Sequence, residues 1–283
     1  FLAFKNVSVS DRRCLACPTL HSGEMVLSHT AYSFSYNEEH EQANWVAYLL
    51  TKAHLGSGVE RSDRFMEDPL VSTGTATNAD YAKSGYDRGH LAPAADMSWS
   101  ETVMQESFYY SNMSPQLPGF NRGIWKRLEE QVRTWAEILD TIYVVTGPVL
   151  SDGLPTIGPN QVSVPKYYYK VILDHHEHPK AIAFILPNQG SKESLTRYVV
   201  SIDELEKITG IDFFPGLVDK EENALEKEVC IACWSWTTSS TGSRSHHSSN
   251  NVGTSSQCMG TTKKGARCKR MTKDASGYCY QHD

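Results

Sequence analysis

The segment from Asn121 to Leu139 limits the fold of this chain more than any other part of the sequence. Apolar residues recur there at steps of three and four positions, which is the spacing of one face of an α-helix: Ile124, Leu128, Val132, Trp135, Ala136 and Leu139. An apolar, β-branched run follows at once, 141–148, and its Gly-Pro end predicts a buried strand. Because the helix must cover its apolar face, we expect an α+β fold, a mixed β-sheet with packed helices.

Other segments add strands and helices to this frame. Strand patterns occur at 25–36, 166–173 and 180–186, and the last two are predicted to form a hairpin. Helix start signals occur at Asn37, at Ser98 or Ser100, and in the capping box 201–204. The first of these helices is expected to run to about Lys52, and the last to end before Gly210.

The composition changes at Thr237. Residues 237–256 are Ser, Thr, Gly, Asn and His almost throughout, which cannot build a core and is typical of a flexible linker. The predicted organisation is a main domain at 1–236, a linker at 237–257 and a small Cys/His C-terminal module at 258–283. No run of eighteen apolar residues occurs, so no membrane-spanning helix is expected.

Charge is divided unequally between these parts. The chain carries a net charge of −6, and residues 237–283 hold seven Lys or Arg against two Asp, which leaves −11 for the rest. An acidic main domain is not a general binder of polyanions. Any contact with nucleic acid therefore needs a locally basic cleft, to which the tail adds nonspecific attraction.

The seven cysteines fall into two groups. The main domain holds two Cys-x-x-Cys pairs, 14/17 and 230/233, which fit two disulfides or one four-cysteine zinc site, and less well a redox pair. The C-terminal module has almost no aliphatic residues and cannot fold on hydrophobic burial. We therefore expect structural zinc there, with a disordered basic tail as the alternative; its ligands would be Cys258, Cys268, Cys279 and His282.

The stretch Ser84 to Pro93 carries the residues with the clearest chemistry. His90 follows Arg88 and Gly89 directly. A neutral imidazole takes a proton from water near pH 7, a guanidinium holds a phosphate, and glycine lets the backbone approach a substrate. A structural, hydrogen-bonded histidine is the alternative that any single His allows. The combination favours hydrolysis of a phosphodiester.

The ordered set of motifs resembles the DNA/RNA non-specific endonucleases, which are ββα-metal (His-Me finger) nucleases of the endonuclease G type. Four segments carry the resemblance: Thr77–Tyr81, Ser84–Pro93, Ser111–Gln116 and Asn121–Glu129. Similar segments extend from Met25 to Leu217. The resemblance implies a ββα-metal core in which a β-ribbon bears His90 and the helix near Asn121 crosses behind it. It also implies a Mg²⁺-dependent, sequence-non-specific endonuclease that leaves 5′-phosphate ends on DNA and RNA.

Residue by residue, the resemblance implies that His90 is the general base, Arg88 a phosphate contact and Asn121 the ligand of Mg²⁺, with Mn²⁺ or Ca²⁺ as substitutes. A plain helix N-cap is the alternative for Asn121. Glu129 and Arg133 match the family's acid and arginine on the same helix. Because Asn121 and Glu129 are roughly 12 Å apart along a helix axis, we expect Glu129 to orient waters around the metal or to hold Arg133. An ordinary helix ion pair is the alternative.

The sequence departs from the family pattern upstream of His90. Where the family has an arginine in a Phe-Arg-x-Asp setting, this chain has Met66, between Phe65 and Glu67. Arg64 is a candidate for the missing phosphate contact and Arg122 is the alternative candidate, and Asp87 is predicted to be a further substrate-binding residue.

Two further groups of residues have more ordinary readings. The histidines and Glu177 in 175–178 are expected to form a solvated turn rather than a metal site. Asn112 is expected to hydrogen-bond the backbone around the active site.

Two other functions are alternatives to an endonuclease. One is a phosphodiesterase or pyrophosphatase for small nucleotides, and the other is an inactive module that binds nucleic acid or protein.

The expected partners are the DNA and RNA backbone, because phosphates carry no sequence information. A homodimer and an inhibitor protein are further partners that the family allows, and no membrane is expected. The missing initiator Met and the cysteine pairs favour a secreted or periplasmic protein, with a mitochondrial or other intracellular location as the alternative.

Overall fold

The computed structural model describes residues 17–19, 25–56, 58–237, 256–257, 260–261, 267–269 and 271–272. The chain divides into two compact units, Phe1–Thr237 and Thr238–Asp283. In the second unit β12 (Ser256–Gln257) pairs with β13 (Met271–Thr272), and Cys268 is buried. The other three predicted zinc ligands, Cys258, Cys279 and His282, lie outside the described residues.

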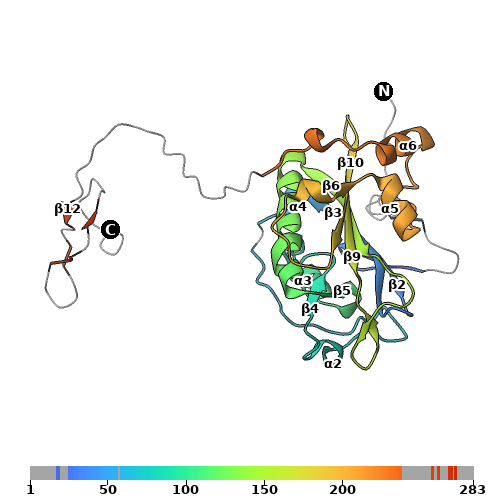
Figure 1. The fold of residues 1–283 in the computed structure, drawn as a ribbon, viewed down its shortest axis with the longest axis horizontal. Helices are drawn as coiled ribbons and strands as arrows, with labels where there is room; N and C mark the ends of the chain where they lie inside the picture. Colours follow the sequence, from blue (N-terminus) through green and yellow to red (C-terminus); the bar gives the residue numbers. More distant parts are fainter. Residues whose placement is uncertain are drawn as a thin grey trace. The chain divides into compact units, whose positions relative to one another are not determined.

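A seven-stranded sheet forms the centre of the first unit (Figure 1). Its order is β1-β2-β3-β6-β9-β10-β11, and the strands are Val26–Ser28, Tyr32–Asn37, Gln42–Thr51, Thr141–Pro148, Tyr167–Asp174, Lys180–Pro187 and Val199–Val200. Every neighbouring pair of strands is antiparallel. The sheet is therefore antiparallel, whereas the sequence analysis predicted a mixed sheet. Short turns join β1 to β2, β2 to β3 and β9 to β10, and such turns permit only antiparallel pairing.

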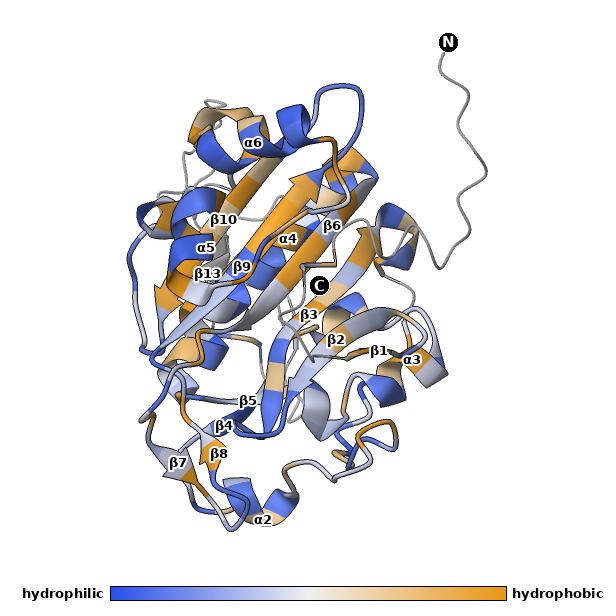
Figure 2. Ribbon diagram, turned by 90° about the vertical axis from the view of Figure 1, so that its right-hand side faces the viewer, coloured by the Kyte–Doolittle hydropathy of each residue, from blue (hydrophilic) through white to orange (hydrophobic). Residues whose placement is uncertain are grey.

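Helices cover both faces of this sheet. Helix α4 (Lys126–Leu139) lies on one face, and α5 (Ile202–Thr209) and α6 (Asp219–Lys227) lie on the other (Figure 1). Trp135 of α4 packs in the same core as Phe184 of β10, whereas Leu205 of α5 packs with Val171 of β9. Apolar residues therefore run the length of the central strands (Figure 2).

The predicted helix from Asn37 to Lys52 is wrong, because this segment is a tight turn followed by β3. The Asn37 side chain caps the turn and not a helix, since its Oδ1 accepts from the backbone of Glu39 and His40 at 3.0 and 3.2 Å. Strand β3 lies between β2 and β6 and is buried on both sides, at Trp45 and Tyr48 among others. Burial on both faces removes the alternation that identifies a strand in a sequence.

Most other predicted elements are present. The 25–36 segment forms two strands, β1 and β2, and the 166–186 hairpin is β9 and β10. Helix α5 begins after Ser201, whose hydroxyl accepts from the Glu204 amide, and ends at Gly210 in the left-handed conformation. The remaining short elements are α2 (Asn78–Tyr81), α3 (Glu101–Glu106), η2 (Lys52–His54), η3 (Ala94–Asp96), η4 (Tyr110–Asn112), η6 (Leu195–Tyr198), β7 (Thr156–Ile157) and β8 (Val162–Ser163).

The turn between β9 and β10 is exposed at His176, Glu177 and His178, as expected for a solvated loop. His175 pairs with Glu221 at 3.2 Å, and His176 with Asp174 at 2.5 Å. The contact with Glu221 joins this turn to α6. No metal-binding cluster includes these histidines in the part of the chain that the structure describes.

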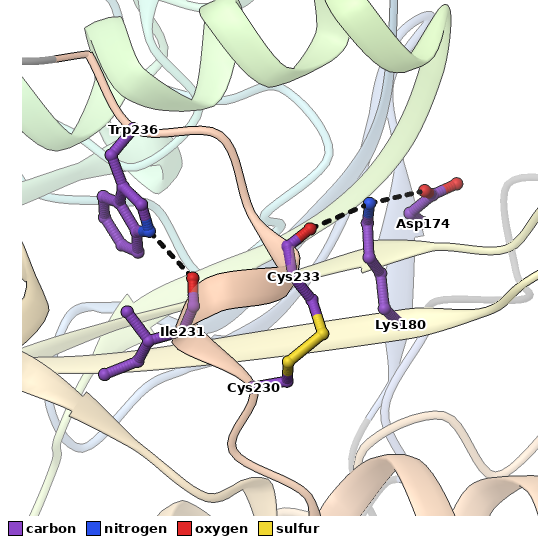
Figure 3. The surroundings of a disulfide bond; sticks show 6 residues. All are labelled: Asp174, Lys180, Cys230, Ile231, Cys233 and Trp236. Carbon is purple, nitrogen blue, oxygen red and sulfur yellow. Dashed lines mark hydrogen bonds and ion pairs between the residues drawn. A yellow bond between two sulfur atoms is a disulfide. The ribbon is translucent and has the colours of Figure 1, made fainter.

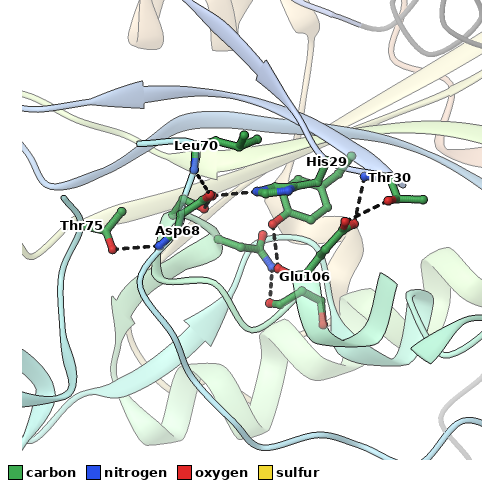
Figure 4. A network of polar contacts seen from close by, with 10 residues as sticks. His29, Thr30, Asp68, Leu70, Thr75 and Glu106 are labelled. Atoms are coloured by element: carbon green, nitrogen blue, oxygen red, sulfur yellow. Dashed lines mark hydrogen bonds and ion pairs between the residues drawn. The ribbon is translucent and has the colours of Figure 1, made fainter. Parts of the chain in front are cut away.

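A buried network around Asp68 fixes the long loop that leads to the active site (Figure 4). Asp68 Oδ2 pairs with His29 Nε2 at 2.8 Å and accepts from the Ser111 hydroxyl, while its Oδ1 accepts from the Leu70 amide at 2.9 Å. The same loop pairs with the chain after α3, where Met66 N donates to Phe108 O at 3.2 Å. The aperiodic segment is therefore held in place by polar contacts rather than by regular structure.

A local disulfide joins Cys230 to Cys233 near the C-terminal end of this unit (Figure 3). It spans the short helix η7 (Ile231–Cys233). Its surroundings include Lys180, which donates to the Cys233 carbonyl at 3.3 Å. The chain beyond it packs on α4, since Trp135 Nε1 donates to the Ser235 carbonyl at 2.5 Å. For this pair the disulfide reading is confirmed; Cys14 lies outside the described residues, and Cys17 is buried. None of the helices in the described ranges is long and apolar enough to cross a membrane.

Candidate active site

A two-stranded ribbon carries the Asp-Arg-Gly-His motif. Strand β4 (Asp87–His90) pairs antiparallel with β5 (Met113–Gln116), and Gly89 lies opposite Ser114. A Cβ atom on residue 89 would lie 2.2 Å from the Gln116 side chain, so any residue other than glycine would force Gln116 to move. The chain then enters η5 (Phe120–Trp125), a π-helical turn that continues into α4. Ribbon and helix together form the expected ββα arrangement.

His90 is held among aromatic rings at the end of the ribbon. Its ring meets Phe108 edge-on at 4.8 Å between centroids and lies 6.0 Å from Phe65. The residue is 8% exposed, and its Nε2 is buried with no hydrogen-bond partner in the described part of the chain. Burial, and then the positive charge of Arg61, lower the pKa of His90 to about 3. The imidazole is therefore neutral at physiological pH, as a proton acceptor must be.

Asn112 fixes the chain that follows His90. Its Nδ2 donates to the carbonyls of Ala92 and Ser107 at 2.9 and 2.8 Å, and its Oδ1 accepts from the Ala92 amide at 2.9 Å. The Leu91 amide also donates to the Asn112 carbonyl. The expected role of Asn112 as a backbone clamp beside the active site is present.

Asp87 connects the ribbon to η5. Its Oδ2 accepts from Asn121 Nδ2 at 2.9 Å and from Arg122 Nε at 2.8 Å, and its Oδ1 accepts from Arg122 Nη2 at 2.5 Å. Burial opposes the charge, but the hydrogen bonds from Arg122 and Asn121 outweigh it and hold the pKa of Asp87 below its usual value. Asp87 thus orients two predicted site residues, and Asn121 is not the N-cap of either helical segment.

The donor set fits a hard divalent cation. An ionised carboxylate only accepts hydrogen bonds, so Asn121 must turn its Nδ2 toward Asp87, and its Oδ1 is left as the ligand atom. Amide and carboxylate oxygens are the ligands that Mg²⁺ takes from proteins, usually one or two of them with water completing the shell. Asn121 and Glu129 both line the same cleft as His90.

Glu129 and Arg133 belong to a four-element network rather than to a helix ion pair. Arg133 Nη1 donates to Asp96 Oδ1 of η3 at 2.8 Å, and Tyr48 of β3 donates to Asp96 Oδ2 at 2.9 Å. Burial, followed by the negative charge of Asp96, raises the pKa of Glu129 to about 7, against the attraction of Lys170 and Arg133. Glu129 is thus a carboxyl group of the cleft whose pKa lies near neutrality.

Lys170 of β9 lies beneath this network. It is fully buried, its Nζ lies 4.8 Å from the centroid of Trp125, and that Nζ has no hydrogen-bond partner among the described residues. Burial lowers the pKa of Lys170 to about 8, with the attraction of Glu129 opposing that shift. With Lys170 and Arg133 charged, the two carboxylates of Asp96 and Glu129 are balanced.

The cleft beside His90 has a volume of about 360 Å³ and is basic. Five cationic side chains and one acidic one line it: Arg61, Arg88, Arg122, Lys126, Arg133 and Glu129. Arg88 stacks over Phe65 at 4.4 Å and donates to Asn78 of α2. Arg64 is exposed and does not line this cleft, whereas Arg61 lies over the Phe108 ring at 5.0 Å. The expected basic island on an acidic domain is present, with Arg61 where Arg64 was expected.

Three residues of this region were missed by the sequence reasoning. Arg61 lies in an aperiodic loop, Asp96 in a short loop and Lys170 in an apolar strand. A lysine inside the otherwise apolar run of β9 was a usable signal, because lysine is almost never fully buried without a specific role. Nothing local distinguishes Arg61 from Arg64.

Three comparisons with known proteins agree with this geometry. Residues 17–220 match the family model described as DNA/RNA non-specific endonuclease. Nuclease C1 of Cunninghamella echinulata var. echinulata is 40% identical over 224 residues, which covers 73% of this chain and 87% of that protein. The mitochondrial Nuclease EXOG of Danio rerio is 39% identical over 214 residues, 69% of this chain, and the match spans 62% of its length.

A solved structure is similar as well. The crystal structure of the EndoG/EndoGI complex, which describes the mechanism of EndoG inhibition, contains a chain that is 32% identical to this one, with a TM-score of 0.68. The similarity covers 74% of this chain and 91% of that chain.

Proposed function

Because this chain belongs to the DNA/RNA non-specific endonuclease family, we propose that it hydrolyses phosphodiester bonds of DNA and RNA in the cleft beside His90, with Mg²⁺ on Asn121. Membership of this family makes the protein a metal-dependent endonuclease. One observation supports the proposal most strongly: His90 and Asn121 line the same basic cleft. His90 is buried and neutral there, and Asp87 binds the amide nitrogen of Asn121, so that the amide oxygen is available to a metal.

The protein's own groups divide the work of the reaction. His90 takes the proton from a water molecule, which attacks phosphorus and leaves a 5′-phosphate. Arg88 and Arg61 hold the phosphate oxygens, and Phe65 and Phe108 hold these two guanidinium groups. Bound Mg²⁺ would neutralise the charge that gathers on phosphorus and on the leaving oxygen. Asp87 orients Asn121, while Glu129 accepts hydrogen bonds from water in the cleft.

Low sequence selectivity follows from the kind of contact the cleft offers. Five cationic side chains line it, and such groups bind phosphates, which are identical in every nucleotide. The acidic surroundings limit binding to the cleft itself. We therefore propose DNA and RNA backbones alike as substrates, rather than small nucleotides.

The test is plasmid nicking and RNA cleavage by purified full-length protein with Mg²⁺ or with EDTA. His90→Ala is expected to lower kcat by at least about 10²-fold, the usual contribution of a general base, and EDTA is expected to abolish cleavage by the wild-type protein. His178→Ala is the matched control, since this histidine is exposed in the β9–β10 turn. Full activity in the His90 variant, or in EDTA, would contradict the mechanism.

For the second unit we propose structural zinc on Cys258, Cys268, Cys279 and His282. The buried Cys268 lies beside a short β12–β13 pairing, and its carbonyl accepts from Gln257 Nε2 at 3.0 Å. A unit with so few apolar residues cannot fold by hydrophobic burial, so it needs a metal to hold its structure. Less than one equivalent of zinc in the purified protein would refute this assignment.

We also propose partners and a cellular location for this protein, by analogy with other members of the family. The EndoG/EndoGI complex supports an inhibitor protein as a partner, and a homodimer stays a prediction that a measured molar mass in solution can check. We propose that the protein is secreted or periplasmic. The alternative is a mitochondrial location, which the name of the EXOG relative specifies for that protein. Fractionation of the producing cells separates the two.

A further inference from the structure

Five carboxylates gather where α5 and α6 meet, on the sheet face opposite α4 and away from the cleft. They are Asp203 and Glu206 on α5, Asp212 in the connection, and Glu222 and Glu226 on α6. Their oxygens form two overlapping sets of three, 203/206/226 and 212/222/226, and within each set all lie within 4.8 Å of one another. Glu226 belongs to both sets. We call these five residues the α5–α6 carboxylate cluster.

The centre of this cluster is buried and lacks a partner. Glu226 is 8% exposed, and its Oε1 has no hydrogen-bond partner in the described part of the chain. The Oε1 atom of Glu222 is buried and unpartnered in the same way. No Lys, Arg or His of the described residues forms an ion pair with any of the five. Buried carboxylates without a counter-charge are strongly unfavourable, so this arrangement needs a cation or a shared proton.

We propose that the α5–α6 carboxylate cluster is a Ca²⁺ site, separate from the catalytic metal. All its donors are carboxylate oxygens, which are the ligands of a hard cation. Glu222 and Glu226 are four residues apart on α6, and Asp203 and Glu206 three apart on α5, so each pair lies on one side of its helix. Ca²⁺ accepts six to eight oxygens in a flexible geometry, whereas Mg²⁺ demands a near-ideal octahedron and keeps its waters.

The cation would join two elements that otherwise repel each other. Asp203 and Glu206 of α5 approach Glu226 of α6 within 4.8 Å, so negative charges of the two helices face each other. Bound Ca²⁺ would hold α6 against α5, and α6 leads directly to the Cys230–Cys233 disulfide. The predicted consequence is higher stability of the first unit, with no part in the chemistry at His90.

The test uses full-length protein carrying Asn121→Ala, so that the catalytic metal site does not contribute. Its Tm is followed by circular dichroism at pH 8 in metal-free buffer while CaCl2 is added at constant ionic strength. Burial and the repulsion of its neighbours raise the pKa of Glu226 to about 7, so pH 8 favours the ionised form of this carboxylate. Saturating Ca²⁺ is expected to raise Tm by roughly 5 °C, and calorimetry is expected to give one site.

Substitution separates this site from nonspecific binding. Glu226→Gln in the same background is expected to abolish the response to Ca²⁺, and Glu222→Gln to weaken it at least tenfold in Kd. Glu228→Gln is the matched control, because this glutamate is exposed just after α6, and it should respond like the parent. The proposal is overturned if Ca²⁺ leaves Tm unchanged, if Mg²⁺ at equal concentration acts as strongly, or if Glu226→Gln responds like the parent. Because cleavage is not measured, failure of this test leaves the proposed nuclease mechanism unaffected.

Discussion

At the residue scale, the site depends on which atoms its neighbours leave available. Asp87 takes the amide nitrogen of Asn121 and thereby presents the amide oxygen to a metal. Phe108 and Phe65 enclose His90 and keep its imidazole neutral. Neither effect is a property of the isolated residue, and both come from a partner far away in the sequence.

The guanidinium that replaces the family arginine at Met66 can be identified by substitution. Arg61 lines the cleft and Arg64 does not, so Arg61→Ala is expected to lower kcat/KM on DNA by about 10²- to 10³-fold, the loss typical of a transition-state donor. Arg64→Ala, the matched control three residues away, should stay within about twofold of wild type. Steady-state kinetics at one ionic strength measure both, and the reverse order of effects would assign the role to Arg64.

At the element scale, the β4–β5 ribbon has no tolerance for a side chain at residue 89. Gln116 fills the space where a Cβ would lie. The same ribbon carries Asp87, two residues before Gly89, and His90, directly after it. A shift of one strand would therefore move His90, the proposed general base, relative to Asn121, so we expect packing and catalysis to be coupled in this element.

Gly89→Ala is expected to lower the free energy of unfolding by about 1–3 kcal/mol, as overpacking does, and to reduce kcat. Adding Gln116→Ala removes the obstructing side chain, so alanine at 89 should cost much less in that background. Urea unfolding of the four proteins of this double-mutant cycle measures the coupling. Equal costs of Gly89→Ala in both backgrounds would show that the contact with Gln116 does not matter.

At the scale of the whole molecule, the charge balance of the site is assembled from four distant elements. Tyr48 comes from β3, Asp96 from η3, Arg133 from α4 and Lys170 from β9. Together they surround Glu129 and set its ionisation. The sheet and the helix that crosses it therefore control the pH at which the site works.

Because the pKa of Glu129 is about 7 and that of His90 about 3, kcat/KM is expected to rise with pH through about 7. Glu129 is protonated below that value and ionised above it, whereas His90 is neutral throughout. Lys170→Met removes a positive charge that favours ionised Glu129, so the midpoint should move to higher pH. The profile is measured from pH 5 to 9 at constant ionic strength.

Two variants control this profile. Glu129→Gln should lack the limb near pH 7, while Glu130→Gln, an exposed neighbour whose carboxylate pairs with Lys126 at 3.7 Å, should keep it. A limb that survives in Glu129→Gln, or a midpoint that Lys170→Met leaves in place, would assign the titration to another group.

The sequence by itself determined the features that local chemistry and spacing express. The period of three and four residues placed α4, the Gly-Pro pair ended β6, and the run from Ser84 to Pro93 with Asn121 identified the family and the centre of the site. These features are readable because each motif is a short stretch with its own spacing or residue types, and the family resemblance adds only the order of such stretches along the chain.

Only the tertiary structure decided which distant groups meet. It placed β3, buried on both faces, where a helix had been predicted, and it brought Arg61, and not Arg64, to the lining of the cleft. It also paired Arg133 with Asp96, 37 positions away, rather than with Glu129 on its own helix. The physical reason is the same in each case: burial on two faces and the partner of a charge are set by segments that the fold brings together, and no local pattern contains them.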